Sequence, residues 1–203
     1  LNELYASFSC GRPSPLAEPE WQYVDYASWQ REHVQGERLE AELEYWMGQL
    51  EGAPALLELP TDRPRPARAS YAGNTISRKL PFRLLAELKK LANTEHSTLF
   101  MTLTAAFKAL LHRYTGQDDI VVGSVTANRN CTELEGVIGY FVDMLALRTD
   151  LSQNPSFRQL LNRVRKVALE AYAHQDLPFE VLVEKLHPKR NLSYFPVFQV
   201  LLV

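Results

Sequence analysis

Apolar residues recur every three or four positions in several stretches, which is the spacing that predicts amphipathic helices. The chain opens on such a stretch, from Leu1 to Phe8, without a capping residue ahead of it. A second runs from Tyr26 to about Leu50, with charged residues between its apolar positions. We expect both stretches to form amphipathic helices whose apolar faces pack on a core.

Further helices are predicted in the second half of the chain. Two follow each other closely, over residues 82–91 and 99–111, and the second has its stop signal at Gly116. Asn154 and Pro155 begin another, which runs to about Ala173, and Pro178 begins a shorter one.

Four stretches instead have the character of strands. Residues 75–80 alternate apolar and polar, while 119–125, 140–151 and 196–203 are apolar and rich in β-branched or aromatic residues. Proline-rich segments over 10–20 and 52–70 predict extended connections. Strands alternating with helices favour an α/β layered fold, with helices covering a sheet. Because the first helix lacks a cap and the last strand has no turn after it, we expect the chain to continue at both ends.

Composition supports a packed domain and excludes several classes of function. With 203 residues, 46% of them apolar, the chain is long enough for a sizeable core. The formal net charge is −2 and basic residues are spread along the chain, so we expect no nucleic-acid partner. No apolar run is long enough to cross a membrane, and a cytoplasmic protein fits best.

Cysteine and histidine spacing predicts no metal site. Cys10 and Cys131 are far apart, and we expect two buried or idle thiols. The five histidines form neither an HExxH nor a CxH arrangement.

The sequence HQDLPFE, over 174–180, combines a histidine with a carboxylate ahead of a helix. His174 oriented by Asp176 would make a general base. The more frequent role of His, Gln and Asp at such a junction is to satisfy free N–H groups of the helix start, and we favour that interpretation.

Four ordered motifs carry a family resemblance: YVDYASW at 23–29, IGYFVDMLALR at 138–148, HQDLPFE at 174–180 and RNLSYFPVFQV at 190–200. In order and approximate spacing the chain resembles the condensation domains of nonribosomal peptide synthetases. The positions that match the motifs and are expected to shape the fold are Tyr23, Asp25, Tyr26, Trp29, Gly139, Phe141, His174, Gln175, Asp176 and Pro178.

The resemblance implies a V-shaped domain of two chloramphenicol acetyltransferase-like lobes. Residues 1–30 would be the tail of the first lobe and the crossover, and 31–203 the second lobe, truncated at its end. The family forms a peptide bond between groups held as thioesters on phosphopantetheine arms, so the implied partners are peptidyl or aminoacyl carrier domains, the missing first lobe and an adjacent adenylation domain. No cofactor is bound directly. The family's catalytic HHxxxDG motif is absent from this sequence, which has no adjacent His pair.

By motif position, the candidates to border the substrate tunnel are Ser124, Asp143, Arg148 and Arg190. Each has a structural alternative: Arg148 could pair with Asp150 or Asp143, and Ser124 could be a small residue needed for packing. Asp143 stands where the family commonly has Asn. An Asn side chain both donates and accepts hydrogen bonds, whereas the Asp carboxylate is charged and only accepts them. Asn191 and Phe195 also depart from the family pattern.

Two other functions remain open from the sequence. The chain could belong to a non-catalytic platform of the same superfamily that recruits another enzyme, or to a stand-alone acyltransferase of small molecules with this fold. The sequence upstream distinguishes the platform from the enzyme, because a degenerate histidine motif would favour the former.

Overall fold

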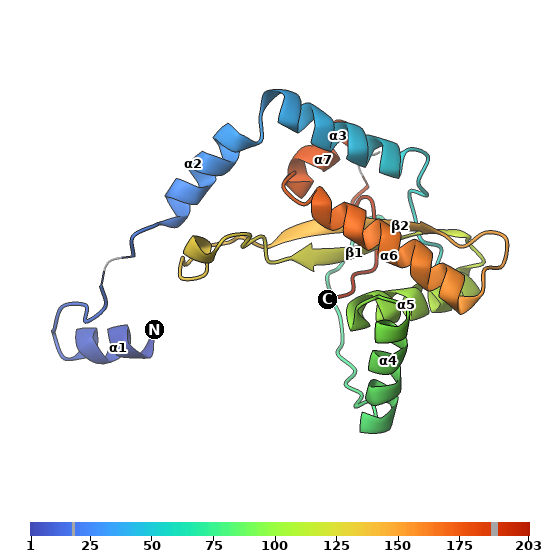
Figure 1. The fold of residues 1–203 in the computed structure, drawn as a ribbon, viewed down its shortest axis with the longest axis horizontal. Helices are drawn as coiled ribbons and strands as arrows, with labels where there is room; N and C mark the ends of the chain where they lie inside the picture. Colours follow the sequence, from blue (N-terminus) through green and yellow to red (C-terminus); the bar gives the residue numbers. More distant parts are fainter. Residues whose placement is uncertain (18, 188–190) are drawn as a thin grey trace.

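The centre of the molecule is a pair of antiparallel strands. The computed structural model describes residues 1–17, 19–187 and 191–203. Strands β1 (Asp119–Thr126) and β2 (Asp143–Asp150) pair along their whole length, with Thr126 opposite Asp143 and Asp119 opposite Asp150 (Figure 1). The loop between them contains a short 3-10 helix, η1 (Thr132–Leu134).

Helices α5 (Leu99–Thr115) and α6 (Phe157–Ala173) pack on the strands and on each other (Figure 1). The predicted stop signal of α5 is confirmed, since Gly116 has a left-handed φ of 70°. At the helix starts, Thr98 accepts a hydrogen bond from the Met101 amide, and Ser156 forms a capping box with Gln159, so α6 begins at Phe157 rather than at the predicted Asn154 and Pro155. A core cluster joins the two helices to the strands through Met101, Ala105, Leu111, Ile120, Val122, Leu160, Leu161, Val164 and Ala168.

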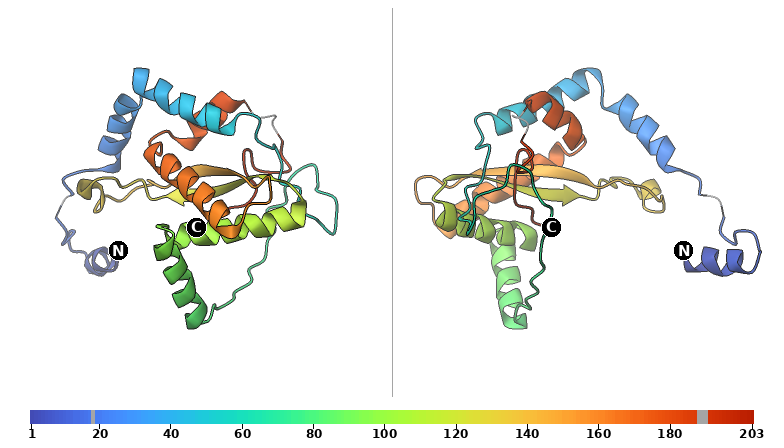
Figure 2. Two further views of the ribbon diagram at one scale, coloured as in Figure 1. Left: turned by 45° about the vertical axis from the view of Figure 1, so that its right-hand side comes forward. Right: turned by 180° about the vertical axis from the view of Figure 1, so that it is seen from behind.

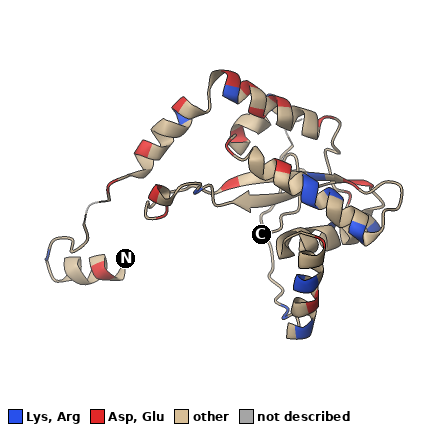
Figure 3. Cartoon of the chain, viewed as in Figure 1, with Lys and Arg blue, Asp and Glu red and all other residues tan. Residues whose placement is uncertain are grey.

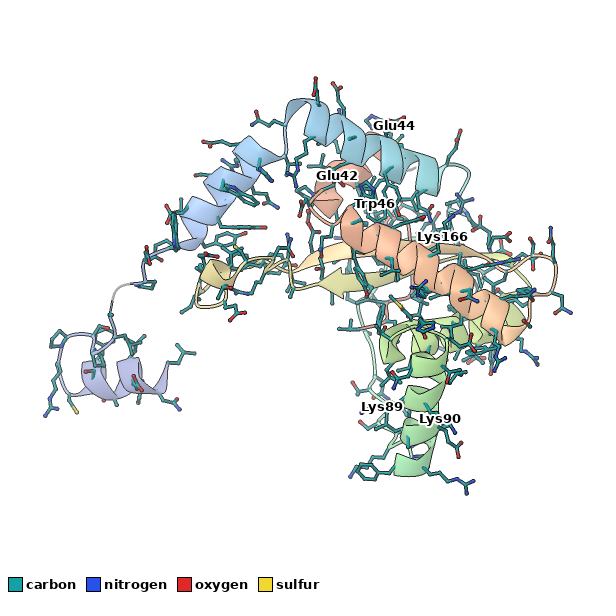
Figure 4. The ribbon with its side chains drawn as sticks, in the orientation of Figure 1. Glu42, Glu44, Trp46, Lys89, Lys90 and Lys166 are labelled. Carbon is teal, nitrogen blue, oxygen red and sulfur yellow. The ribbon has the colours of Figure 1, made fainter. Side chains whose placement is uncertain are left out.

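A second core cluster lies under α3 (Gly36–Leu50) and α7 (Phe179–Leu186). Trp46 is its largest member, 2% exposed, and lies on the side of α3 that faces the rest of the molecule (Figure 4). Its indole Nε1 donates to the His174 carbonyl at 2.8 Å, so the polar edge of this buried ring is satisfied. We call the strands with α3, α5, α6 and α7 the body.

Lys108 crosses the inside of the body from α5 to the strands. Its side chain is fully buried, and Nζ donates to the carbonyls of Ile120 and Leu147 and to Thr149 Oγ1, at 3.3, 2.5 and 2.8 Å. Burial away from any paired carboxylate lowers the pKa of Lys108 to about 7. Lys108 therefore ties α5 to both strands by hydrogen bonds rather than by an ion pair.

The N-terminal part of the chain extends away from the body. Helix α1 (Asn2–Ser9) has no buried residue and stands apart in every view (Figures 1 and 2). Helix α2 (Tyr23–His33) packs on the loop that joins β1 to β2, through a small cluster of Tyr26, Val137 and Phe141. We call α2 together with residues 127–142 the α2 arm. Helix α4 (Phe82–Thr94) projects on another side, where it packs on α5 (Figure 2).

One predicted helix is wrong. The expected single helix from Tyr26 to Leu50 is two helices, α2 and α3, that meet at a bend over residues 34–35. Gly36 has a left-handed φ of +55°, which is strained for other residues, and the apolar spacing continues on both sides of it. The periodicity therefore detected both helices and missed the break.

Two predicted strands are also wrong in part. Residues 75–80 are extended and exposed but pair with no other described segment, so their alternation does not produce a strand. The predicted strand at 140–151 begins at Asp143, and that at 196–203 is reduced to a single bridge between Leu201 and Gly123. The α/β layering itself is confirmed, as are helices α1, α4, α5, α6 and α7.

Candidate functional site

The candidate site lies at the end of the ladder where β1 finishes and β2 begins. Thr126 and Asp143 face each other there, and residues 174–178, between α6 and α7, approach the same end. The Thr126 hydroxyl donates to Gln175 Oε1 at 2.7 Å and also accepts from the Asn128 amide at 3.2 Å. The Thr126 hydroxyl thus joins the end of β1 to the segment between α6 and α7.

Asp143 is the carboxylate at the centre of this arrangement. Its Oδ1 accepts from its neighbour's amide, Met144 N, at 2.7 Å and from Phe179 N, in the first turn of α7, at 3.2 Å. Burial raises the pKa of Asp143, while these two backbone N–H groups act in the opposite direction. Asp143 therefore satisfies a free N–H group at the start of a helix from another element of the fold.

The HQDLPFE residues do not have the role predicted for them. His174 Nδ1 lies 3.1 Å from Glu42 Oε2, and its ring stacks on Tyr45 with 3.9 Å between centroids. Asp176 pairs with Arg38 at 2.5 Å. These contacts join the junction to α3, and Figure 4 shows Glu42 on the helix above it. The expectation that His174, Gln175 and Asp176 satisfy the start of α7 is wrong, because Asp143 accepts from Phe179 instead. Pro178 is the N-cap residue, without a side-chain bond.

Arg148 lies at the opposite end of the strands and does not pair as predicted. Its Nη2 is 2.7 Å from Asp119 Oδ2, its Nε reaches both carboxylate oxygens of Asp119, and its Nη1 donates to the carbonyls of Gln49 and Glu51. The predicted partners Asp150 and Asp143 are both wrong. Asp119 is the partner because it stands on the neighbouring strand, where sequence distance conceals it.

Ser124 is buried in β1, and its hydroxyl donates to the Leu202 carbonyl at 3.0 Å. This contact ties the C-terminal segment to the strand. The fourth predicted tunnel residue, Arg190, lies outside the described residues.

The motif residues of α2 and of the loop beside it come together as one aromatic cluster. Tyr26 and Phe141 rings lie 4.6 Å apart, and the Tyr23 hydroxyl donates to the Tyr140 carbonyl at 2.8 Å. Gly139 is required by this packing, since a Cβ there would lie 2.2 Å from the Tyr23 ring. Asp25 has a local role, because its carboxylate accepts from the Gln22 amide in a capping box.

Arg129 completes the cluster and was missed by the sequence analysis. Its guanidinium lies 4.0 Å from the centre of the Phe141 ring and donates to the carbonyls of Leu134 and Val137. The only signal in the sequence was its place in the polar stretch between two strands, which gave no reason to single it out.

Beside this cluster the structure contains a cavity of about 540 Å³. It lies between α2 and the start of the loop, and its lining includes Trp21, Tyr26, Trp29, Leu134, Cys131 and Glu133. Cys10 and Cys131 are free and exposed, so of the predicted alternatives, buried or idle thiols, the first is wrong and the second stays a prediction. Within residues 1–17, 19–187 and 191–203 no cluster of side chains has the composition of a metal site, and no helix is both long and apolar enough to cross a bilayer.

Comparison with known proteins identifies the family. The family model described as Condensation domain matches residues 1–203. The chain is 56% identical over 203 residues to a linear gramicidin synthase of Brevibacillus parabrevis, in a match that covers all of this chain and 3% of that protein. It is 46% identical over 201 residues to malpinin synthetase of Mortierella alpina, in a match that covers 99% of this chain and 3% of that protein. The chain thus spans only a small part of the length of these relatives.

Solved structures agree with the sequence relatives. The X-domain in its complex with OxyB from teicoplanin biosynthesis superposes with a TM-score of 0.91 at 32% identity, over 98% of this chain and 45% of that one. A four-domain nonribosomal peptide synthetase, holo-AB3403 bound to AMP and glycine, gives 0.84 at 26% identity, over 98% of this chain and 15% of that one. The family model covers the whole chain and both superpositions cover 98% of it, and the chain belongs to the condensation-domain family of nonribosomal peptide synthetases.

Proposed function

We propose that this chain is the framework part of a condensation domain that joins a donor and an acceptor group through a peptide bond. The observation that carries the proposal is the family match over all 203 residues. Peptide-bond formation is the activity of that family, and the 56% identity to a linear gramicidin synthase supports the assignment.

The two groups would arrive as thioesters on the phosphopantetheine arms of peptidyl or aminoacyl carrier domains. The other partners we propose are an adenylation domain of the same synthetase and a first lobe that supplies the catalytic histidine. The whole assembly would act in the cytoplasm.

The contrast between α1 and the body supports the proposed division of the chain. We assign 31–203 to the second lobe, because α3, α5, α6 and α7 share two core clusters with the strands. We assign 1–30 to the tail of the first lobe and the crossover, since α1 has no buried residue.

The role of the chain would be to shape the tunnel rather than to perform the chemistry. No two histidines are adjacent in the sequence, so a paired-histidine motif must come from elsewhere. Ser124, Asp143, Arg148 and Arg190 remain the tunnel candidates, and we favour Asp143. Its second carboxylate oxygen accepts no hydrogen bond from a described residue, so it is available to orient an incoming amine.

The proposal is tested with the complete condensation domain that contains this chain, together with loaded donor and acceptor carrier proteins. We expect a dipeptidyl thioester, and we expect Asp143→Asn to change acceptor turnover. The matched control is Asp150→Asn at the far end of β2, which should leave turnover unchanged. Absence of any product from the complete domain would contradict the activity. Equal turnover of wild type and Asp143→Asn would contradict only the role of Asp143.

One observation favours a second candidate function. The X-domain that superposes with a TM-score of 0.91 was solved in complex with OxyB, so a member with this fold binds another protein. A chain of this kind could likewise belong to a recruiting platform. An intact HHxxxDG motif in the sequence upstream of Leu1 in the parent gene would reject the platform, and a degenerate one would favour it.

A further inference from the structure

The cavity beside α2 has aromatic walls: Tyr26 is buried against Phe141, and one face of Trp29 stacks on His33 with 4.4 Å between centroids, while both tryptophans keep about half of their surface exposed. Tyr26 and Trp29 lie one turn apart on the same face of α2, and Trp21 stands just ahead of the helix. Trp21 is 48% exposed and Trp29 50% exposed, although each ring has a large apolar surface to bury. A cavity of about 540 Å³ is large enough to enclose a side chain together with part of its backbone.

With histidine counted as neutral, as for the formal net charge, the charged side chains at the cavity are all acidic; His33 is the one other titratable base that lines it among the described residues. Three carboxylates line it, from Asp25, Glu133 and Asp176, and no lysine or arginine does so among residues 1–17, 19–187 and 191–203. Two of the three already have partners: Asp25 accepts from the Gln22 amide and Asp176 pairs with Arg38. Glu133 is exposed and forms no ion pair with a described residue. Figure 3 shows acidic positions on α2 and on the loop that contains η1, together with a basic position near the end of α2.

Aromatic faces and an available carboxylate together select a cation that has an apolar stem. The negative faces of two indole rings attract a guanidinium or ammonium group, and the stem covers the ring surface. An anion would meet three carboxylates, and a purely apolar group would leave Glu133 without a partner.

The surroundings indicate that the cation belongs to a protein segment. The same α2 arm also exposes Val24 (66%), Ile138 (89%) and Tyr140 (71%), which lie outside the cavity. A small amine would fill the cavity and leave these residues in water, whereas a polypeptide can cover both.

We propose that the α2 cavity receives an arginine or lysine side chain from a protein segment with apolar residues beside the basic one. The two tryptophans enclose the stem, and Glu133 pairs with the charge. This site is separate from the tunnel end of the strands, and it does not depend on the proposed activity.

The test uses three capped tripeptides that differ only at the central residue: acetyl-Leu-Arg-Leu-amide, acetyl-Leu-Gln-Leu-amide and acetyl-Leu-Glu-Leu-amide. Binding to the 203-residue protein is followed by the indole N–H resonances of its tryptophans. Trp46 is an internal control, because its indole is bonded to the His174 carbonyl inside the body. We expect the Arg peptide to shift Trp21 and Trp29 but not Trp46, and to bind about five- to tenfold more tightly than the Gln peptide.

Glu133→Gln tests the charge without removing a buried group. It should weaken the Arg peptide about threefold and leave the Gln peptide unchanged, while Glu135→Gln, on the same loop but outside the cavity, should change neither. Equal binding of the Arg and Glu peptides, or shifts at Trp46 alone, would overturn the proposal. Binding of 4-phenylbutylamine without binding of the Arg peptide would overturn the assignment to a protein segment.

Discussion

The body and the α2 arm both contain motifs of the same family, but their motif residues differ in how far the rest of the chain encloses them. In the body, His174, Gln175 and Asp176 each contact another element, and Trp46 is 2% exposed. In the arm, three buried residues hold α2 to its loop, and the motif residue Trp29 remains 50% exposed. The chain encloses the motif residues of the body, whereas in the arm Trp29 contacts only neighbouring rings of its own helix, Tyr26 and His33, and stays half exposed.

This difference in enclosure indicates which motif residues to test for an effect on stability and which for an effect on binding. A motif residue whose side chain is enclosed by the chain itself contributes to the folding free energy. One that remains exposed beside a cavity is better explained by a contact with another part of the protein. The first prediction compares one tryptophan of each kind.

Trp46→Ala should be far more destabilising than Trp29→Ala. Trp46→Ala leaves a large cavity in the core under α3 and removes the bond to the His174 carbonyl, so we expect a loss of about 3 to 5 kcal/mol in the free energy of unfolding. Trp29→Ala should cost less than about 1 kcal/mol, because half of its surface is already in water. Urea unfolding of the two variants measures both values. Similar losses would show that the arm is as firmly packed as the body.

Lys108 should make the stability of the body depend on pH. Burial lowers its pKa to about 7, while in the unfolded chain the pKa is near the ordinary value of 10.5. Between these values the unfolded chain binds a proton that the folded chain does not, so stability rises with pH, by about 2 kcal/mol from pH 7 to pH 9. Below pH 7 Lys108 is protonated in both the folded and the unfolded chain, so its contribution to the free energy of unfolding stays at its minimum.

The matched variant for this measurement is Lys108→Met, which keeps an unbranched chain of similar length. Its unfolding free energy should lack the rise between pH 7 and pH 9. A rise of equal size in both proteins would exclude Lys108 as its source.

Asp143→Asn should have the smallest effect on stability. Asp143 pairs with no arginine among the described residues, and an asparagine oxygen can still accept from Phe179 N, so we expect a change within about 1 kcal/mol at pH 7. Because burial raises the pKa of Asp143, the folded wild type holds its proton to higher pH than the unfolded chain. The stability of the wild type should therefore fall as the pH rises from the pKa of Asp143 in the unfolded chain through its raised pKa in the folded chain. Asp143→Asn should not show this fall. Thermal unfolding across pH 3 to 7 would reveal the difference, and a loss of several kcal/mol at pH 7 would contradict it.

Local patterns predicted much of the fold, and contacts between distant segments account for what was missed. The helix ends at Thr98, Gly116 and Ser156 depend on neighbouring residues, and the sequence contains those signals. The break at Gly36 did not change the apolar spacing, so the periodicity passed over it. Residues 75–80 alternate like a strand, but a strand also needs a neighbour, which alternation does not provide.

The candidate site was predicted less well, for the same reason. Motif positions located Asp143 and Arg148, but their partners Phe179 and Asp119 come from elements 36 and 29 residues away. Charge alone suggested pairing within one strand, at Asp150 or Asp143. The register of β1 against β2 placed Asp119 beside Arg148 instead.

The central claim is that this chain supplies the framework of a condensation domain and another segment supplies its catalytic histidine. The most direct measurement is single-turnover formation of a dipeptidyl thioester from loaded carrier proteins, by residues 1–203 alone and by the complete domain that contains them. The account predicts product with the complete domain and none with residues 1–203. Product from residues 1–203 alone would contradict it, because the chemistry would then not need the histidine that the account assigns to another segment.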